Sequence, residues 1–288
     1  MRYRDEAGLE ITVYTPNERQ GGLVWGLKQA RQDLWGARHI IWRLFVRDFT
    51  AQFKQRLLGY VWALIGPFMG ILNFLFLYFT GVLKPGEGEM PYTLYVLLGS
   101  IIWSMLPGAL GAVSGGLQAQ ADLLLRTRIP KMALAMTSMT GLMYGMFVNL
   151  ITILIVFALY RAWPGWPILL YPFLMLPLLL LGVSMGLILA VVGVIAKDLT
   201  TIVMHGLSLL MYITPVIYLR STITNPWISM LIDWNPITYL VDVPRSLLYY
   251  GHSENLGLYC IISGIILLLM PPAIRLFYLL EDLVAERL

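Results

Sequence analysis

The chain has 288 residues, of which 58% are hydrophobic and only 12% are charged, and its mean hydropathy is +0.74. Soluble domains typically carry about 25% charged residues, so this chain has too little charge to cover a surface that faces water. The composition therefore excludes an ordinary soluble enzyme and indicates an integral membrane protein. The single cysteine, Cys260, excludes a disulfide framework within the chain.

The first 60 residues form a polar arm rich in Lys and Arg, and we expect no signal peptide there. From Val24 to Tyr60 the pattern predicts amphipathic helix, broken near Gly36. One face is aromatic and a second face is basic; the aromatic residues are Trp42, Phe45, Phe49 and Phe53, and the basic ones are Arg43, Arg47 and Lys54. This pattern is typical of an interfacial helix whose basic face meets lipid headgroups or a cytosolic partner. A plain membrane anchor is the alternative.

Six apolar stretches follow the arm, at about 61–82, 92–117, 132–159, 167–196, 200–219 and 255–274. None contains Lys, Arg, Asp or Glu, and each reaches the ~20 residues that cross a bilayer as a helix. We therefore predict an all-α membrane protein with six transmembrane helices. The prolines near the start of the fourth stretch predict irregular first turns.

The basic residues predict the orientation of these helices. Sixteen of the 20 Lys and Arg lie in 1–60, 118–131, 197–199 and 275–288. The positive-inside rule then places both termini in the cytoplasm. This asymmetry also explains the pI of 9.1, so no nucleic-acid partner is expected.

Residues 220–254 connect the fifth and sixth spans and combine charged with aromatic side chains. Asn235-Pro236 divides them into two parts that are too short to span a membrane. We predict a re-entrant helical pair, because irregular backbone at membrane depth must be buried in protein or line a cavity. An amphipathic loop on the membrane surface is the alternative. The residues expected to matter here are Trp227, Trp234, Asp242 and Arg245, of which the last two are spaced to pair.

The spans carry no machinery for catalysis or ion coupling. Within the spans, His205 is the candidate for proton transfer. The alternative is that His205 is a hydrogen-bonded packing residue. The sequence has no Walker A loop, metal-ligand cluster or nucleophile–base pair, so we predict no enzyme activity, metal site or cofactor of its own. Energy for uphill transport would come from a partner.

Aromatic residues are frequent in the first span and recur in the fifth. Sugar rings stack on aromatic faces, so these residues favour a channel for a glycan, although interfacial aromatic belts would give a similar pattern. The predicted channel-lining residues are Tyr60, Trp62, Phe68, Phe76, His205 and Tyr212. Four Gly-x-x-x-Gly pairs, beginning at Gly66, Gly111, Gly141 and Gly182, predict close helix packing.

Several short motifs follow one another in a characteristic order: Arg47-Asp48 before Lys54, Leu58-Gly59-Tyr60-x-Trp62, Ile129-Pro130-Lys131, Lys197-Asp198-Leu199, Thr214-Pro215-Val216-Ile217-Tyr218, and Asn235-Pro236-Ile237-Thr238 before Arg245. In this order the sequence resembles the ABC-2 permeases that export O-antigen, capsule and teichoic-acid polymers. One departure is Gln52-Phe53-Lys54, where members often carry Arg-Tyr.

The resemblance implies an arm (1–60) and an ABC-2 transmembrane domain (61–288) in the inner membrane. It implies a homodimer with two separately encoded ATPase subunits that hold ATP and Mg, and an undecaprenyl-linked polysaccharide as substrate. The loop before the third span would dock on the ATPase through Asp122, Arg126, Arg128 and Lys131, unless its charges only set topology. The arm would act as a gate helix through Arg43, Arg47, Asp48 and Lys54.

Three other functions compete with this interpretation. An ABC-2 permease for drugs or lipids is the alternative within the superfamily. An ion-driven transporter is disfavoured by the uncharged spans. The sequence leaves a structural membrane scaffold open.

Overall fold

A computed structural model describes residues 2–4, 10–12, 22–54, 61–86, 88–120, 129–162 and 165–287. Its elements are β1 (Arg2–Arg4), β2 (Glu10–Thr12), α1 (Leu23–Gly36), α2 (Arg38–Lys54), α3 (Val61–Phe79), α4 (Tyr92–Ala119), α6 (Lys131–Thr137), α7 (Met139–Leu159), the 3₁₀ helix η2 (Trp166–Leu170), α8 (Tyr171–Ile195), α9 (Lys197–Ile213), the 3₁₀ helix η3 (Arg220–Thr222), α10 (Pro226–Trp234), α11 (Pro236–Tyr250) and α12 (Leu256–Arg287). β1 and β2 form a short antiparallel pair within the arm. The other described elements are helical, as expected.

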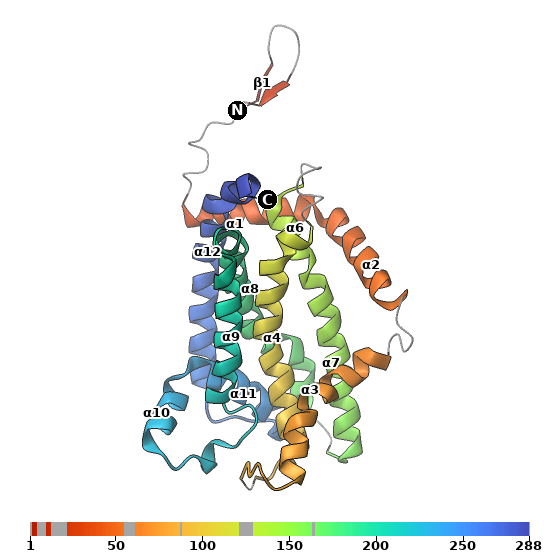
Figure 1. The fold of residues 1–288 in the computed structure, drawn as a ribbon, viewed down its shortest axis with the longest axis vertical. Coiled ribbons are helices and arrows are strands. Elements are labelled where there is room, and N and C mark those ends of the chain that lie inside the picture. Colours follow the sequence, from red (N-terminus) through yellow and green to blue (C-terminus); the bar gives the residue numbers. More distant parts are fainter. Residues whose placement is uncertain are drawn as a thin grey trace.

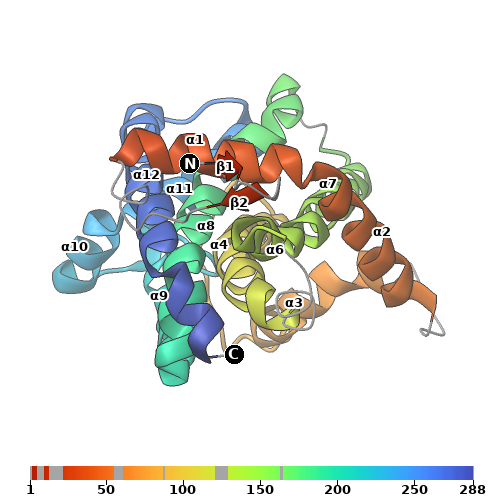
Figure 2. The ribbon, with the colours of Figure 1, turned by 90° about the horizontal axis from the view of Figure 1, so that it is seen from above.

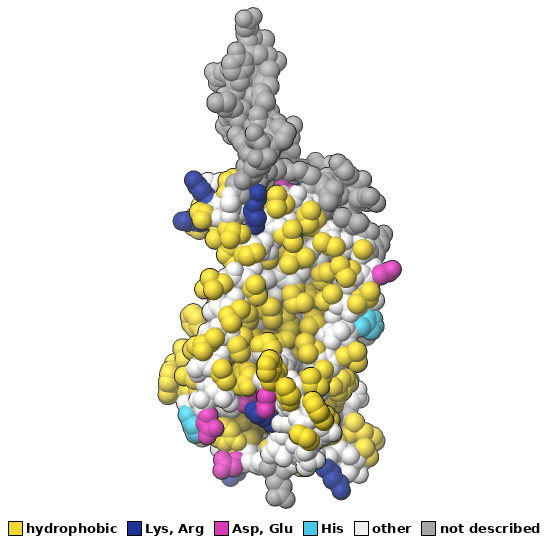
Figure 3. All heavy atoms as spheres, turned by 90° about the vertical axis from the view of Figure 1, so that its left-hand side faces the viewer, with side chains coloured by type: hydrophobic (Ala, Val, Ile, Leu, Met, Phe, Trp, Pro, Cys, Tyr) yellow, Lys and Arg dark blue, Asp and Glu magenta, His cyan; other side chains and the backbone are white. Residues whose placement is uncertain are grey.

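The long helices form a bundle (Figure 1). Four helical stretches are long and apolar enough to cross one: Tyr92–Ala119, Lys131–Leu159, Trp166–Gly193 and Leu256–Glu281. The described parts of α3 and α9 are shorter apolar helices. Figure 3 shows a broad hydrophobic band on one side of the molecule, with charged side chains mainly toward its two ends.

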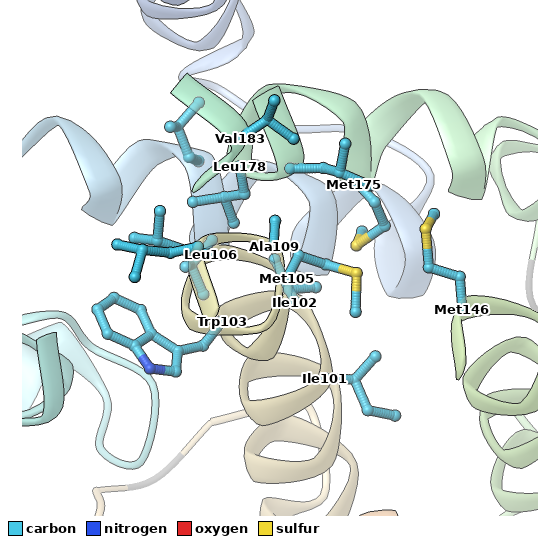
Figure 4. Packing of buried hydrophobic residues seen from close by; sticks show 14 of the residues in the cluster. Ile101, Ile102, Trp103, Met105, Leu106, Ala109, Met146, Met175, Leu178 and Val183 are labelled. Atoms are coloured by element: carbon cyan, nitrogen blue, oxygen red, sulfur yellow. The ribbon is translucent and has the colours of Figure 1, made fainter. Parts of the chain in front are cut away.

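α4 lies in the middle of the bundle and packs along α8 (Figures 1 and 2). Figure 4 shows their contact, in which Met105, Leu106 and Ala109 of α4 face Leu178 and Val183 of α8. The two backbones approach closely at the glycines of α8. A Cβ atom at Gly182 would lie 2.6 Å from the carbonyl oxygen of Leu106.

The predicted Gly-x-x-x-Gly pairs differ in how closely another helix approaches them. Gly182 and Gly186 both lie against α4, where an added Cβ would meet backbone atoms at 3.0 Å or less. This confirms the close packing predicted for that pair. Around Gly66 and Gly141, in contrast, an added Cβ would meet no atom of the described residues within 4 Å.

Several predicted boundaries need correction. The third stretch is interrupted at Ser138, which separates α6 from α7. The fifth ends as a helix at Ile213 rather than at residue 219, and the last helix continues beyond residue 274 to Arg287. The irregular start predicted for the fourth stretch is confirmed, because it begins as the 3₁₀ helix η2.

The arm and the segment before α12 lie at opposite ends of the bundle (Figure 1). α1 crosses one end and packs on the part of α12 that carries Arg275 and Tyr278, and α2 slopes down beside α7 (Figures 1 and 2). The break predicted near Gly36 is confirmed at Ala37. α10 and α11 lie at the other end and are divided at Asn235, as the sequence predicted.

Candidate functional site

At the end of the bundle that carries the arm, polar side chains join α2 to the end of α4. The Arg47 guanidinium forms an ion pair with Asp48 at 2.8 Å and donates a hydrogen bond of 3.2 Å to Oε1 of Gln120. The Gln120 amide in turn donates to Asp48 at 3.5 Å. We call these three residues the arm cluster. Since Arg47 and Asp48 are half exposed, their ion pair contributes only about 0–1 kcal/mol.

The aromatic face of α2 supports this docking. Trp42, Phe45 and Phe49 contact one another in sequence, with ring centroids 5.3 and 5.5 Å apart. Phe49 also meets Tyr144 of α7 edge to face at 4.8 Å. Trp42 itself is 63% exposed. The aromatic face is therefore confirmed for these three residues, and it is shared between α7 and the outside of the molecule. The side chain of Phe53 lies outside the described part of the structure.

A second set of contacts fixes α1 and α6 to α12. Lys131 donates a hydrogen bond of 2.7 Å to the carbonyl oxygen of Glu281. Tyr278 donates to the carboxylate of Asp33 at 2.7 Å, and Arg275 lies 5.2 Å from the ring of Trp25. The helices on either side of residues 121–128 are thus held, one by the arm cluster and the other by α12.

Three predicted coupling residues, Asp122, Arg126 and Arg128, lie outside the described residues. Lys131 is described, but it contacts α12. Of the predicted gate residues, Arg43 is exposed, whereas Arg47 and Asp48 join the arm cluster. Lys54 ends α2, and its side chain lies outside the described part of the structure.

At the other end of the bundle, Arg245 of α11 is buried, with a relative exposure of 1%. It pairs with Asp242 at 2.5 Å, donates to the carbonyl oxygen of Pro215 at 2.9 Å and lies 3.6 Å from the ring centroid of Tyr95. These contacts replace the water that a buried guanidinium loses. The pairing predicted from the i, i+3 spacing is confirmed. We call these four residues the Arg245 cluster.

The Arg245 cluster also satisfies the backbone that follows α9, which ends at Ile213 because Pro215 has no N–H for a further helical turn and holds Thr214 extended. After Ile213 the backbone is no longer helical, so its carbonyl groups need other partners. The Tyr95 hydroxyl donates to the carbonyl oxygens of Pro215 and Tyr218, and Tyr92 donates to that of Ile217. Two tyrosines of α4 therefore satisfy the irregular segment that follows α9.

Polar side chains that follow α9 also form hydrogen bonds with the end of α9 and with the irregular segment after it. The Tyr218 hydroxyl donates back to carbonyl oxygens of the last turn of α9, at 3.0 and 3.2 Å. The Asn235 amide donates to Thr214 at 2.9 Å while its oxygen caps α11 by accepting from the amide of Ile237.

α10 presents apolar side chains outward. Trp227 and Trp234 are exposed to 76% and 79%, which suits contact with lipid or with another protein. Asp233 of this helix forms an ion pair with Arg220 of η3. In contrast to Arg245, the Arg220 side chain is 48% exposed.

The predicted channel residues come from two helices that lie on either side of α4 (Figures 1 and 2). On α3, Phe76 is 66% exposed, whereas Phe68 is half-buried against the core. On α9, Tyr212 and His205 are exposed, and His205 shares a hydrogen bond of 2.8 Å with the carbonyl oxygen of Thr201 in its own helix. Tyr60 and the side chain of Trp62 lie outside the described residues.

Sequence reasoning missed Gln120, Tyr92 and Tyr95. Each lies at an end of α4, where a polar side chain can reach backbone or polar groups that the helix itself does not satisfy. The i, i+3 spacing of the two tyrosines, directly after Pro91, was the available signal.

Comparison with known proteins decides the family. The ABC-2 type transporter family matches residues 39–249, which is most of the chain. The chain belongs to this family. It is 26% identical over 219 residues to the O-antigen export system permease protein RfbA of Myxococcus xanthus, covering 76% of this chain and 83% of that protein. It is 24% identical over 212 residues to the protein of the same name from Klebsiella pneumoniae, covering 71% and 78%.

Proposed function

We propose that this ABC-2 protein is the membrane subunit of an ATP-driven exporter that moves a lipid-linked polysaccharide across the cytoplasmic membrane. The observation that carries the proposal is its similarity, over more than two thirds of both chains, to permeases named for O-antigen export. The ABC-2 family match across 39–249 supports the transport part. Undecaprenyl is the lipid carrier that we propose for the polymer.

The proposed topology has six spans, with α3 and α9 crossing the membrane in addition to the four longer stretches. Residues 1–60 form the cytoplasmic arm and 61–288 the transmembrane domain, with both termini inside. The distribution of Lys and Arg supports this orientation. α10 and α11 form the re-entrant pair in the outer leaflet, supported by the burial of Arg245 and the outward tryptophans of α10.

The proposed assembly contains two copies of this chain and two ATPase subunits. A channel between the copies would use the exposed faces of α3 and α9, where Phe76 and Tyr212 lie. Aromatic faces hold successive sugar units weakly, whereas fixed charges would hold a polymer in one register. The channel therefore needs neither a titratable group nor a metal of its own.

Export of a surface polymer tests this function. We expect deletion of the gene to remove the surface glycan ladder and the intact gene to restore it. The double variant Phe76→Ala/Tyr212→Ala should shorten or weaken the ladder at an unchanged protein level, measured by blot. Phe173→Ala, at an exposed aromatic of α8, is the control. A normal ladder in the deletion strain would favour a drug or lipid exporter.

The loop before α6 is the proposed ATPase contact. Reversing the charges of Asp122, Arg126 and Arg128 together should uncouple ATP hydrolysis from export while the permease stays in the membrane. ATPase co-purification with the permease is the direct measurement. Unchanged co-purification and unchanged export would mean that these charges only set topology.

A further inference from the structure

A pocket of about 220 Å³ lies beside the Arg245 cluster, at the end of the bundle away from the arm. Its wall includes the start of α4, the segment that follows α9, and parts of α11 and the turn before α12. The lining side chains that matter here are Tyr95, Arg220, Ser221, Tyr239, Asp242 and Asn255. None of them belongs to the channel residues on α3 and α9.

The charges around the pocket are balanced. Asp242 is paired with Arg245, and Arg220 is paired with Asp233. Of these four groups only Asp242 and Arg220 line the pocket, and the charge of each is already compensated by its partner. The pocket therefore favours a neutral ligand.

Several polar groups at the pocket are nevertheless available for hydrogen bonds. Among the described residues, the Ser221 hydroxyl and the Asn255 amide make no side-chain hydrogen bond, and only Oδ1 of Asp242 is used by Arg245. The ring of Tyr239 is held in place because its hydroxyl donates to the carbonyl oxygen of Asp233 at 3.0 Å. A hydroxyl, an amide, a carboxylate oxygen and aromatic rings together match a compact ligand with many hydroxyl groups.

We propose that this pocket binds one neutral sugar unit of the polymer near the outer side of the membrane, an inference that rests on the proposed function. Its volume is below the roughly 300–1,000 Å³ of pockets for drug-sized ligands, so it suits a single ring. Only a few groups of the pocket can form hydrogen bonds with a sugar, and they are uncharged or already paired, so the sugar is bound weakly. Weak binding lets the polymer advance instead of stalling.

Photo-crosslinking in polymer-producing cells with the complete transporter tests the pocket. The photoreactive residue p-benzoylphenylalanine replaces Ser221, and in separate strains Phe76 of the proposed channel or Leu231, an exposed residue of α10 that is not part of the pocket. The readout is a light-dependent band that carries both permease and glycan. We expect capture from Ser221 and Phe76 and none from Leu231.

The outcomes separate the pocket from the function. Capture from Phe76 without capture from Ser221 overturns the pocket and leaves the exporter function in place. Surface polymer that is unchanged when the gene is deleted overturns both. Asn255→Trp, which fills the pocket, should remove capture from Ser221, whereas Ser253→Trp on the same turn should not. Capture that persists with the pocket filled also overturns the proposal.

Discussion

Replacing Asp242 with leucine should destabilise the protein more than replacing Arg245 with methionine, although both changes remove the same ion pair. The reason is the difference in burial. The Arg245 side chain is 1% exposed, whereas that of Asp242 is 39% exposed. Asp242→Leu leaves a buried guanidinium that cannot reach water. Arg245→Met leaves a carboxylate that water can hydrate.

The two costs can be estimated from the contacts. Removing one partner of a buried pair typically costs about 3–5 kcal/mol, and we expect Asp242→Leu to fall in this range. Arg245→Met loses a charged hydrogen bond to Pro215, worth about 1.5–3 kcal/mol, and a cation–π contact worth about 2 kcal/mol. It also removes the desolvation penalty of the guanidinium, several kcal/mol. The Pro215 carbonyl keeps its bond from Tyr95, so we expect a net cost of about 2 kcal/mol or less.

Unfolding of the purified protein in detergent, followed by tryptophan fluorescence, measures the difference. The matched controls are Asp233→Leu and Arg220→Met at the neighbouring, more exposed ion pair, each expected to cost less than about 1 kcal/mol. If Arg245→Met proves as destabilising as Asp242→Leu, packing of the arginine stem rather than the isolated charge dominates, and the reasoning above is wrong.

Two further predictions concern α4. Gly182→Ala should cost about 1–3 kcal/mol because its Cβ would lie 2.6 Å from a backbone oxygen of α4. Gly141→Ala, whose Cβ would have no described atom within 4 Å, should be neutral or stabilising in the same unfolding assay. Gln120→Leu should reduce export and alter the ATPase rate of the complete transporter while unfolding changes by less than about 1 kcal/mol. Gln118→Leu, at an exposed position of α4, is its control, and equal export by the two variants would remove Gln120 from coupling.

Local patterns in the sequence predicted the features that depend on neighbouring residues. The helix break after Gly36, the division at Asn235 and the pairing of Asp242 with Arg245 all follow from residues within four positions of one another. Each is governed by helix geometry or capping, which the local sequence contains.

Features that depend on distant partners were not predictable in the same way. Hydropathy stays high to Leu219, so the sequence extends the fifth span past Ile213. Pro215 ends the helix there, because it has no N–H for a further turn and holds Thr214 extended. The partner that satisfies the carbonyl groups that follow is Tyr95, about 120 positions earlier. Gln120 likewise binds a residue 73 positions away. Such partners become visible only once the bundle brings α2, α4 and α9 together.

α4 reaches both polar clusters, and their unequal strength suggests how it would move. Its 28 residues span about 42 Å, from Tyr95 at the Arg245 cluster to a C-terminal end at Gln120. Arg245 is buried with its charge, whereas Gln120 of the arm cluster binds an ion pair that is half exposed and weak. A pull on the arm or on the following loop would therefore release Gln120 before Tyr95. Bending of α4 would concentrate at Pro107, which has no N–H to bond the preceding turn.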